Sequence, residues 1–269
     1  MVRKLQAACL FCSVLLLSVS CANPKSAKQM SFRGMGYDRP ALFVYSVRMV
    51  DLEKGIERFD TLGLFCSNTR SRSVGNQMLM QWQILRKADS FYQLVPERYI
   101  RYYTGISVDD TALFIHPPRE IFRVLQFAPY PYIENNRSFG DSWEWDFEIG
   151  SVWSEPRFFP VDSLETFHIS YTLVNDTVVE SNFGLEKCYQ IRATSKSSFG
   201  VSKANYFLHP EHGLLHCKIH VLDKLVFEFD LIYKTTGLEG ILINKDFSDN
   251  IKAFSSFQYW RGNNSKIVR

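Results

Sequence analysis

The stretch EKCYQIRATSKSSFGVSKANYFLHPEHGLLHCKIHVLDKLVFEFDLIY, residues 186–233, decides the fold class of this chain. It contains four segments with alternating apolar side chains, separated by the turn sequences SSFG, PEHG and DK. Alternation with a period of two is typical of half-buried strands, and connections this short join antiparallel neighbours. Two further strands are expected in DSWEWDFEIG (141–150) and FHISYTLVND (167–176), so the second half of the chain is predicted to be a meander.

The first half of the chain repeats this alternation in shorter segments. Residues 43, 45, 47 and 49 are apolar and share one parity, and residues 78, 80, 82 and 84 do the same. Both patterns predict half-buried strands, and further strands are expected at 56–66, 91–95, 99–107 and 111–116. The predicted fold class is therefore all-β and mainly antiparallel.

One segment, PPREIFRVLQFAPYP (117–131), breaks the strand pattern. Prolines bracket it, and apolar residues recur at helical spacing, namely Ile121, Phe122, Leu125 and Ala128. We therefore expect a short helix over 119–127. The overlapping FAPYPYIENN (127–136) is expected either to line the mouth of a trough or to form a proline-stiffened surface loop.

Residues 140–233 are similar to a group of periplasmic β-proteins. In NFG-x-x-KCYQIRATSKSSFGVSKANYFLHPEHGLL, a strand ending near fG-x-x-cy-i is followed by one reading a-yyf-pe-Gl, as in lipoprotein carriers of the LolA and LolB type and their relatives. The resemblance implies a strongly curved sheet, or half-barrel, whose apolar concave face is plugged by a helix; it does not imply a function. We expect the predicted helix to be this plug and the concave face to form an apolar trough with Phe122, Leu125, Trp143, Trp145 and Phe147.

The N-terminus has the anatomy of a secretory signal, because Arg3 and Lys4 precede an uncharged, largely apolar stretch at 5–20. That stretch is too short to span a bilayer, which takes roughly 20 residues. LLLSVSCA (15–22) resembles the lipobox of Gram-negative envelope lipoproteins, which implies lipidation at Cys21 after cleavage. Ordinary cleavage after Ser20 or Ala22, giving a soluble secreted protein, is the alternative.

These readings divide the chain into four parts. We expect a signal peptide at 1–20 and a lipidated N-terminus with a polar tether at 21–39. A single β-rich domain follows at 40–233, with 117–140 as the place where it could be subdivided. A loosely packed tail at 234–269 completes the chain. The expected location is the cell envelope, anchored to the membrane by lipid, at the outer membrane on the periplasmic or surface side.

Charge and cysteine content narrow the choice of partners. Without residues 1–20, the chain has 29 basic and 28 acidic residues, which argues against a nucleic-acid partner because such a partner needs a basic patch. Cys66, Cys188 and Cys217 are odd in number and far apart, so they form no disulfide framework, although one bridge between two of them stays open.

The segment HPEHGLLHCKIH (209–220) places four histidines close together. On a strand, His216 and His220 lie about 13 Å apart, too far for one tetrahedral ion to bind both. His209 and His212 flank a tight turn and could meet. Because further ligands are not evident, we expect no metal and no other cofactor.

The segment SWEWDFEIG (142–150) contains three acidic residues that could be read as catalytic carboxylates. Its three acids lie on one face about 6.6 Å apart, a spacing seen in glycosidase carboxylate pairs, but apolar residues fill the opposite face. The plain interpretation is an amphipathic strand with Glu144, Asp146 and Glu148 in solvent. The sequence contains no G-x-S-x-G, S-x-x-K or H-E-x-x-H motif, so we expect a non-enzyme, with a carbohydrate-active enzyme as a distant third hypothesis.

Two hypotheses for function remain. The first is a lipoprotein that binds or carries an apolar ligand or a lipid in its trough. The second is a structural or interaction lipoprotein of the outer envelope, whose trough is filled by its own side chains and whose partners are envelope proteins. An unoccupied apolar cavity of several hundred cubic ångströms would favour the first hypothesis.

Overall fold

The structure, a computed structural model, describes residues 29–31, 34–71, 77–88, 91–95, 98, 104–151, 154 and 160–236. The predicted signal peptide, Cys21 and residues 237–269 of the predicted tail lie outside the described residues, as do residues 99–103 of a predicted strand. Within the described part of the chain, none of the helices combines the length and the apolar character that crossing a membrane requires.

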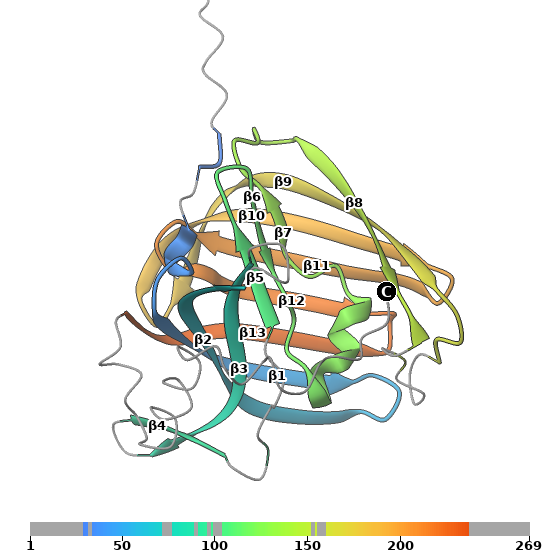
Figure 1. The fold of residues 1–269 in the computed structure, drawn as a ribbon, viewed down its shortest axis with the longest axis horizontal. Helices are drawn as coiled ribbons and strands as arrows, with labels where there is room; N and C mark the ends of the chain where they lie inside the picture. Colours follow the sequence, from blue (N-terminus) through green and yellow to red (C-terminus); the bar gives the residue numbers. More distant parts are fainter. Residues whose placement is uncertain are drawn as a thin grey trace, which may run out of the picture.

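The described strands form one antiparallel sheet, which confirms the predicted fold class (Figure 1). Its path runs β7-β6-β5-β3-β2-β1-β13-β12-β11-β10-β9-β8, and β4 pairs with β3 beside that path. All six strands predicted in the second half of the chain are present. The strands are β1 (Ala41–Asp51), β2 (Ile56–Ser71), β3 (Gln77–Ala88), β4 (Phe91–Leu94), β5 (Thr104–Val108), β6 (Ala112–Ile115), β7 (Tyr132–Glu134), β8 (Ser142–Ile149), β9 (Glu165–Ser181), β10 (Gly184–Ser197), β11 (Gly200–His209), β12 (Gly213–Val221) and β13 (Leu225–Thr236).

The sheet curves around a single main core on its concave face. Strand β12 shows the rule, because Cys217 and Ile219 are fully buried whereas His216 and His220 lie on the opposite, partly exposed face. Strand β1 departs from this rule at its start, because Leu42 and Val44 are also fully buried and pack with Phe65 and Leu85 in a second, smaller apolar cluster. Elsewhere, as in β11 and β12, alternate side chains are buried on the concave face, as the period-two pattern predicts.

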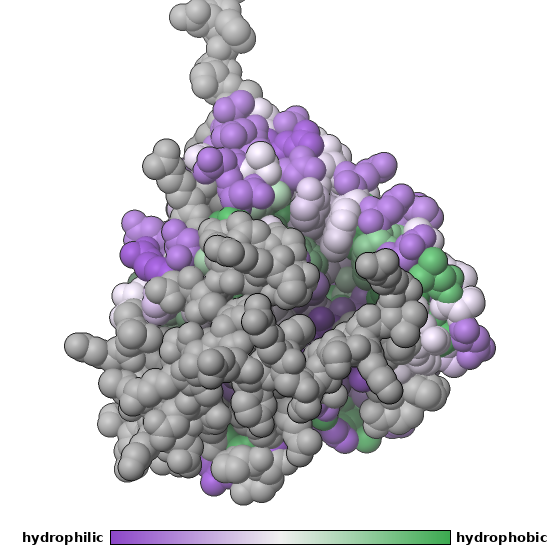
Figure 2. All heavy atoms as spheres, viewed as in Figure 1, coloured by the Kyte–Doolittle hydropathy of each residue, from purple (hydrophilic) through white to green (hydrophobic). Residues whose placement is uncertain are grey.

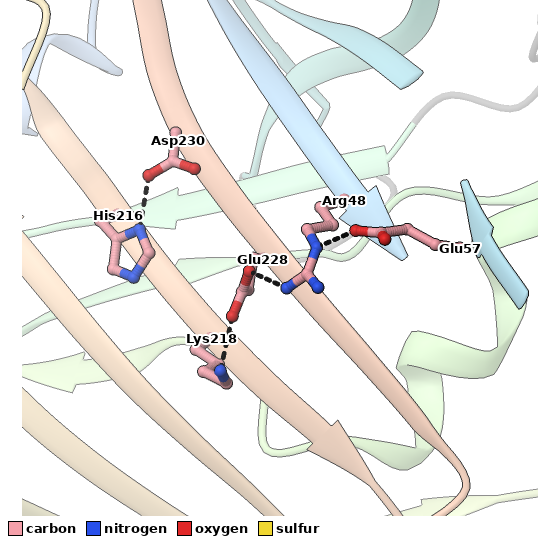
Figure 3. A network of polar contacts seen from close by, with 6 residues as sticks. All are labelled: Arg48, Glu57, His216, Lys218, Glu228 and Asp230. Carbon is pink, nitrogen blue, oxygen red and sulfur yellow. Dashed lines mark hydrogen bonds and ion pairs between the residues drawn. The ribbon is translucent and has the colours of Figure 1, made fainter. Parts of the chain in front are cut away.

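The convex face carries a ladder of charges across four strands (Figure 3). Lys218 Nζ lies 2.6 Å from one carboxylate oxygen of Glu228, and Arg48 Nη1 lies 2.8 Å from the other. Arg48 also pairs with Glu57 on β2, which extends the ladder to the next strand. The hydrogen bond from Lys218 and, to a smaller extent, the one from Arg48 lower the pKa of Glu228. Exposed pairs of this kind contribute little stability each, so we read the ladder as a solvated face of the sheet.

The two ends of the strand path meet through side chains. Trp143 Nε1, on β8, donates a hydrogen bond to the carbonyl of Tyr132, on β7, at 2.9 Å. The ring of Trp145 lies 4.9 Å from that of Phe114 and 5.2 Å from that of Tyr132. These contacts join β8 to β6 and β7 where no strand ladder pairs them, so the curved sheet is nearly closed.

The packed domain includes residues that precede β1. Met30, Met35 and Tyr37 are fully buried, although they fall in the segment expected to be a tether. The Tyr37 hydroxyl accepts a hydrogen bond from the backbone N–H of Leu214 at 2.8 Å, and its ring crosses so close to Gly213 that a side chain there would collide with it. Apolar side chains ahead of β1 therefore complete the core.

Candidate functional site

The helix η3 (Glu120–Phe127) confirms the prediction of one short helical segment over 119–127, but it is a 3-10 helix. Phe122, Val124, Leu125 and Phe127 are buried. Ile121, expected on the buried side with Phe122 and Leu125, is 55% exposed, so that part of the prediction is wrong. A 3-10 helix repeats every three residues, so Ile121, Val124 and Phe127 form one row along the helix. Ile121 is the first residue of this row and lies at the open end of the helix, whereas Val124 and Phe127 lie further inside.

The helix packs on the concave face, in front of the sheet in Figure 1. The ring of Phe122 lies 6.3 Å from that of Phe227 on β13, and the ring of Phe127 lies 5.7 Å from that of Phe167 on β9. The predicted plug position is therefore correct. Its contacts run to strands in the middle and on one side of the sheet.

The three aromatic residues of β8 that we expected beneath the helix lie instead beside the seam where the sheet ends meet. Trp143 stacks on Tyr171 with ring centroids 5.6 Å apart. Trp145 stacks on Phe147, and Phe147 stacks on Phe167, which links this row to the helix. Phe122 and Leu125 lie on the buried side of the helix itself. The five residues of the expected trough therefore occupy two adjoining regions.

Residues 116–132, which we call the strap, run through the concave side and are tied to the sheet at both ends. Side chains of the sheet donate hydrogen bonds to strap carbonyls. Before the helix, Trp82 Nε1 donates to His116 O at 3.0 Å. After it, the pairs are Ser202 Oγ to Phe127 O at 3.0 Å, Tyr206 Oη to Pro129 O, Tyr171 Oη to Tyr130 O at 2.9 Å, and Trp143 Nε1 to Tyr132 O at 2.9 Å.

The prolines of the strap fit this arrangement. Buried backbone donors and acceptors need partners, and a proline has no N–H to satisfy. The strap contains prolines at 117, 118, 129 and 131, all buried. Its buried carbonyls then take their hydrogen bonds from the sheet. FAPYPYIENN is therefore not a surface loop at its proline-rich start, because Pro129, Tyr130 and Pro131 lie inside the molecule.

The helix between these tied ends is held in another way. Phe122, Val124 and Leu125 reach the sheet with apolar side chains. Arg123 Nη1 donates to the carbonyl of Ser154 at 3.4 Å, outside the sheet. The helix starts without a side-chain cap, and Glu120 has a φ of 55°, in the left-handed region that costs energy for a residue with a side chain.

A cavity of about 170 Å³ opens beside the start of the helix. Its apolar walls come from Met49, Phe122, Val124 and Leu225, and Ile56 and Ile121 form an exposed apolar lip. Charged residues complete its rim, namely Asp51, Lys54, Arg58, Asp60 and Arg98. The cavity is smaller than the several hundred cubic ångströms of a typical ligand pocket, although an apolar cavity of about 150 Å³ holds a benzene molecule.

Two ionisable residues lie at the entrance of the strap. Burial lowers the pKa of His116 to about 4, and the neighbouring Arg119 adds to this effect. Burial also lowers the pKa of Arg119 to about 10, with Arg123 contributing repulsion. Charge in this region is therefore costly, and His116 is neutral at pH 7.

The histidines at the β11–β12 turn do meet, with ring centroids of His209 and His212 4.6 Å apart. Glu186 on β10, which the sequence did not single out, lies 3.0 Å from His209 Nε2, and the three residues together could hold a metal ion. However, His209 Nδ1 accepts hydrogen bonds from the backbone N–H groups of Glu211 and His212. In a neutral imidazole the proton is then on Nε2, which lies 3.0 Å from Glu186, so the nitrogen that faces a metal has no free lone pair.

The other residues that the sequence singled out lie on the outer surface of the sheet or in the core. Glu144, Asp146 and Glu148 are exposed along β8, as the interpretation of an amphipathic strand predicts. His168 Nδ1 lies 3.0 Å from Asp146 on the same outer surface. The cysteines at 66, 188 and 217 are buried and free. Figure 2 shows hydrophilic residues gathered over the turns near β6 and β7, with smaller hydrophobic areas elsewhere on the described surface.

No protein-family model matches the chain, and no curated protein matches its sequence. Similar solved structures include a protein described as exported, with a YmcC-like fold, from Bacteroides fragilis (9% identity, TM-score 0.39, covering 78% of this chain and 100% of that one). A protein described as a lipoprotein from Parabacteroides distasonis (9%, 0.41, 77% and 99%) and a LolA superfamily protein from Nitrosomonas europaea (12%, 0.30, 79% and 96%) are also similar. These are the kinds of protein that the sequence resemblance names, and at these identities and scores the similarity carries no conclusion about function.

Proposed function

We propose that the chain is a lipid-anchored protein of the cell envelope that binds an apolar ligand or lipid chain, without enzymatic activity, between helix η3 and the concave face of the sheet. The signal-like N-terminus followed by Cys21 supports the anchor and the export. Several acyl chains on that cysteine would hold the protein on a membrane stably. The outer membrane is the proposed site.

The observation that carries the binding proposal is the difference between the helix and its flanks. The strap ends are fixed by hydrogen bonds from five buried side chains, whereas Phe122, Val124 and Leu125 contact the sheet by apolar packing. Elements that move for a ligand are drawn from the less stable parts of a fold. The helix can therefore lift as a lid while the strap ends stay in place, which would extend the 170 Å³ cavity along the sheet.

The structural or interaction lipoprotein is the second candidate, and the filled concave face favours it. Leu125 and Phe127 are fully buried, and the cavity beside the helix is small. If the helix never opens, the trough serves only as a core and the protein would act through its outer surface on envelope proteins.

Hydrogen exchange of the full chain separates the two candidates. If the helix is a lid, the amides of residues 121–125 exchange at least about tenfold faster than those of β11 to β13, and a long-chain alcohol added as the probe slows them. Native mass spectrometry of the protein extracted from membranes then also detects a retained amphiphile. Helix amides as slow as those of β12, with no retained mass, would contradict the binding proposal.

A further inference from the structure

The cavity at the start of the helix combines two kinds of chemistry. Its walls are apolar, and they include the buried Phe122, Val124 and Leu225. Its lip is also apolar, because Ile56 and Ile121 remain 45% and 55% exposed on either side of the opening. The volume of about 170 Å³ is comparable to that of a cavity that holds one benzene molecule, and here apolar groups supply about half of the lining and polar groups the rest.

The rim is charged at positions that belong to the concave face. Arg58 on β2 is opposite Met49 on β1, and Asp60 is opposite Val47, so both share a face with core residues. Charged residues on this face mark the place where the buried core ends at the opening. Alternation alone would place an apolar residue at position 58, as it does at 62 and 64.

The acids of the rim already have partners. Asp60 accepts two hydrogen bonds from Arg98, at 2.5 and 3.0 Å. Asp51 accepts hydrogen bonds from the backbone N–H groups of Glu53 and Lys54 and lies 3.7 Å from Lys54 Nζ. Among the residues that the structure describes, the side chain of Arg58 makes no ion pair or hydrogen bond. With three cations and two acids, the rim offers one positive charge in excess at the mouth of an apolar cavity.

We infer that this cavity takes the first carbons of a single-chain amphiphile, and that Arg58, with Lys54 beside it, binds the anionic head group of that molecule. The inference rests on the proposed function and names its ligand class. A guanidinium group suits a carboxylate or a phosphate because it can donate two parallel hydrogen bonds. The chain carbons replace water at the apolar walls, and the head group stays at the charged rim.

The test uses the full chain with octanoate and 1-octanol, which share a chain and differ in charge. Calorimetric titration should detect octanoate binding. Arg58→Gln should weaken it about fivefold, the effect of one solvent-exposed charge pair, while octanol binding stays unchanged. Arg58→Lys should restore part of the loss, and raising the salt concentration should weaken octanoate alone. Lys196→Gln, an exposed cation on β10, is the matched control and should change neither ligand.

Other outcomes overturn the inference in distinguishable ways. If octanoate and octanol bind equally and Arg58→Gln changes neither, or lowers both alike, the head-group assignment fails and the proposed function stands. If neither binds, the cavity is not an entry site. The proposed function then fails too only if native mass spectrometry finds no retained amphiphile and the helix amides exchange as slowly as those of β12.

Discussion

The hydroxyl of Ser202, on β11, donates a hydrogen bond to the carbonyl of Phe127 at 3.0 Å and accepts one from the backbone N–H of Leu222 at 3.1 Å. Ser202 is fully buried, so no solvent can replace either bond. One small side chain thus joins the end of the helix, the strand β11 and the turn after β12. Directly opposite on β10, Ser195 is also buried, but its hydroxyl has no hydrogen-bond partner in the described part of the chain.

This pair gives the first prediction. Ser202→Ala leaves a buried carbonyl and a buried N–H without partners and should lower the free energy of unfolding by about 1–3 kcal/mol. Ser195→Ala removes a hydroxyl that has no partner and should be neutral or stabilising. Urea unfolding of both variants measures the difference. Equal losses would mean that the Ser202 bonds do not hold the strap.

A second matched pair tests whether the helix is a lid. Phe127→Ala, at the tied end of the helix, should cost about 3–5 kcal/mol, the usual loss for a buried phenylalanine. Phe122→Ala, in the apolar part, should cost less than about half of that, because a lid belongs to the less stable part of the fold. Denaturant midpoints provide the comparison. A loss of 3–5 kcal/mol for Phe122→Ala as well, by the same scale, would make the helix a permanent part of the core.

The strands could be predicted from the sequence because their signal is local. In β12 the buried Cys217 and Ile219 alternate with outward-facing residues, and PEHG and DK mark its two turns. The route of the strap could not be predicted. Its carbonyls find partners on Tyr171 and Tyr206, 41 and 77 residues further along the chain. Neither residue is distinguished from an ordinary core tyrosine by its neighbours in sequence.

The positions of Trp145 and Arg58 could not be predicted for a similar physical reason. We expected Trp145 beneath the helix, but it lies at the seam because the two ends of the sheet meet there, an event that no local pattern encodes. Nothing in the sequence singles out Arg58 within the strand expected at 56–66. Its place on the concave face follows only from the register with β1, which sets it opposite Met49.

Stability should fall in mild acid because of His116. Its pKa is about 4 in the folded state and about 6.5 when unfolded, so the unfolded chain binds a proton first as the pH drops. The contribution of the neutral ring is complete above pH 6.5 and is lost as the pH falls toward 4, at most about 3 kcal/mol. Urea unfolding at pH 7.5 and 4.5 should show a smaller loss for His116→Gln than for the wild type. His220→Gln, on the convex face, serves as the control, and an equal loss in all three proteins would exclude His116 as the cause.

The membrane anchor is tested at Cys21. Cys21→Ala should abolish labelling with a radioactive fatty acid and release the protein from membranes, because the lipid would be attached to that sulfur. The urea midpoint should not change, since Met30 is the first core residue in the described part of the chain. If the alanine variant is still labelled, the lipobox interpretation is wrong. If the wild type is unlabelled, cleavage after Ser20 or Ala22 gives a soluble secreted protein.

The last prediction concerns Glu186, His209 and His212, which look suited to zinc by proximity alone. For His209 to bind zinc through Nε2, its proton would have to move to Nδ1, where it would face the backbone N–H groups of Glu211 and His212. The turn would lose two hydrogen bonds, so we expect no stoichiometric metal and no change in the unfolding temperature with one equivalent of zinc.

His209→Asn tests whether the two hydrogen bonds of the turn are the reason that His209 binds no zinc. Asparagine can accept the same two backbone hydrogen bonds through its side-chain oxygen, as in other turns that start with this residue, but it cannot reach Glu186 in the way that Nε2 does. The variant should therefore keep the wild-type stability to within about 1 kcal/mol, the value of a neutral hydrogen bond. One zinc per chain by elemental analysis, or a zinc-dependent rise in the unfolding temperature that His209→Asn removes and His216→Asn retains, would show that metal binding prevails over the hydrogen bonds of the turn.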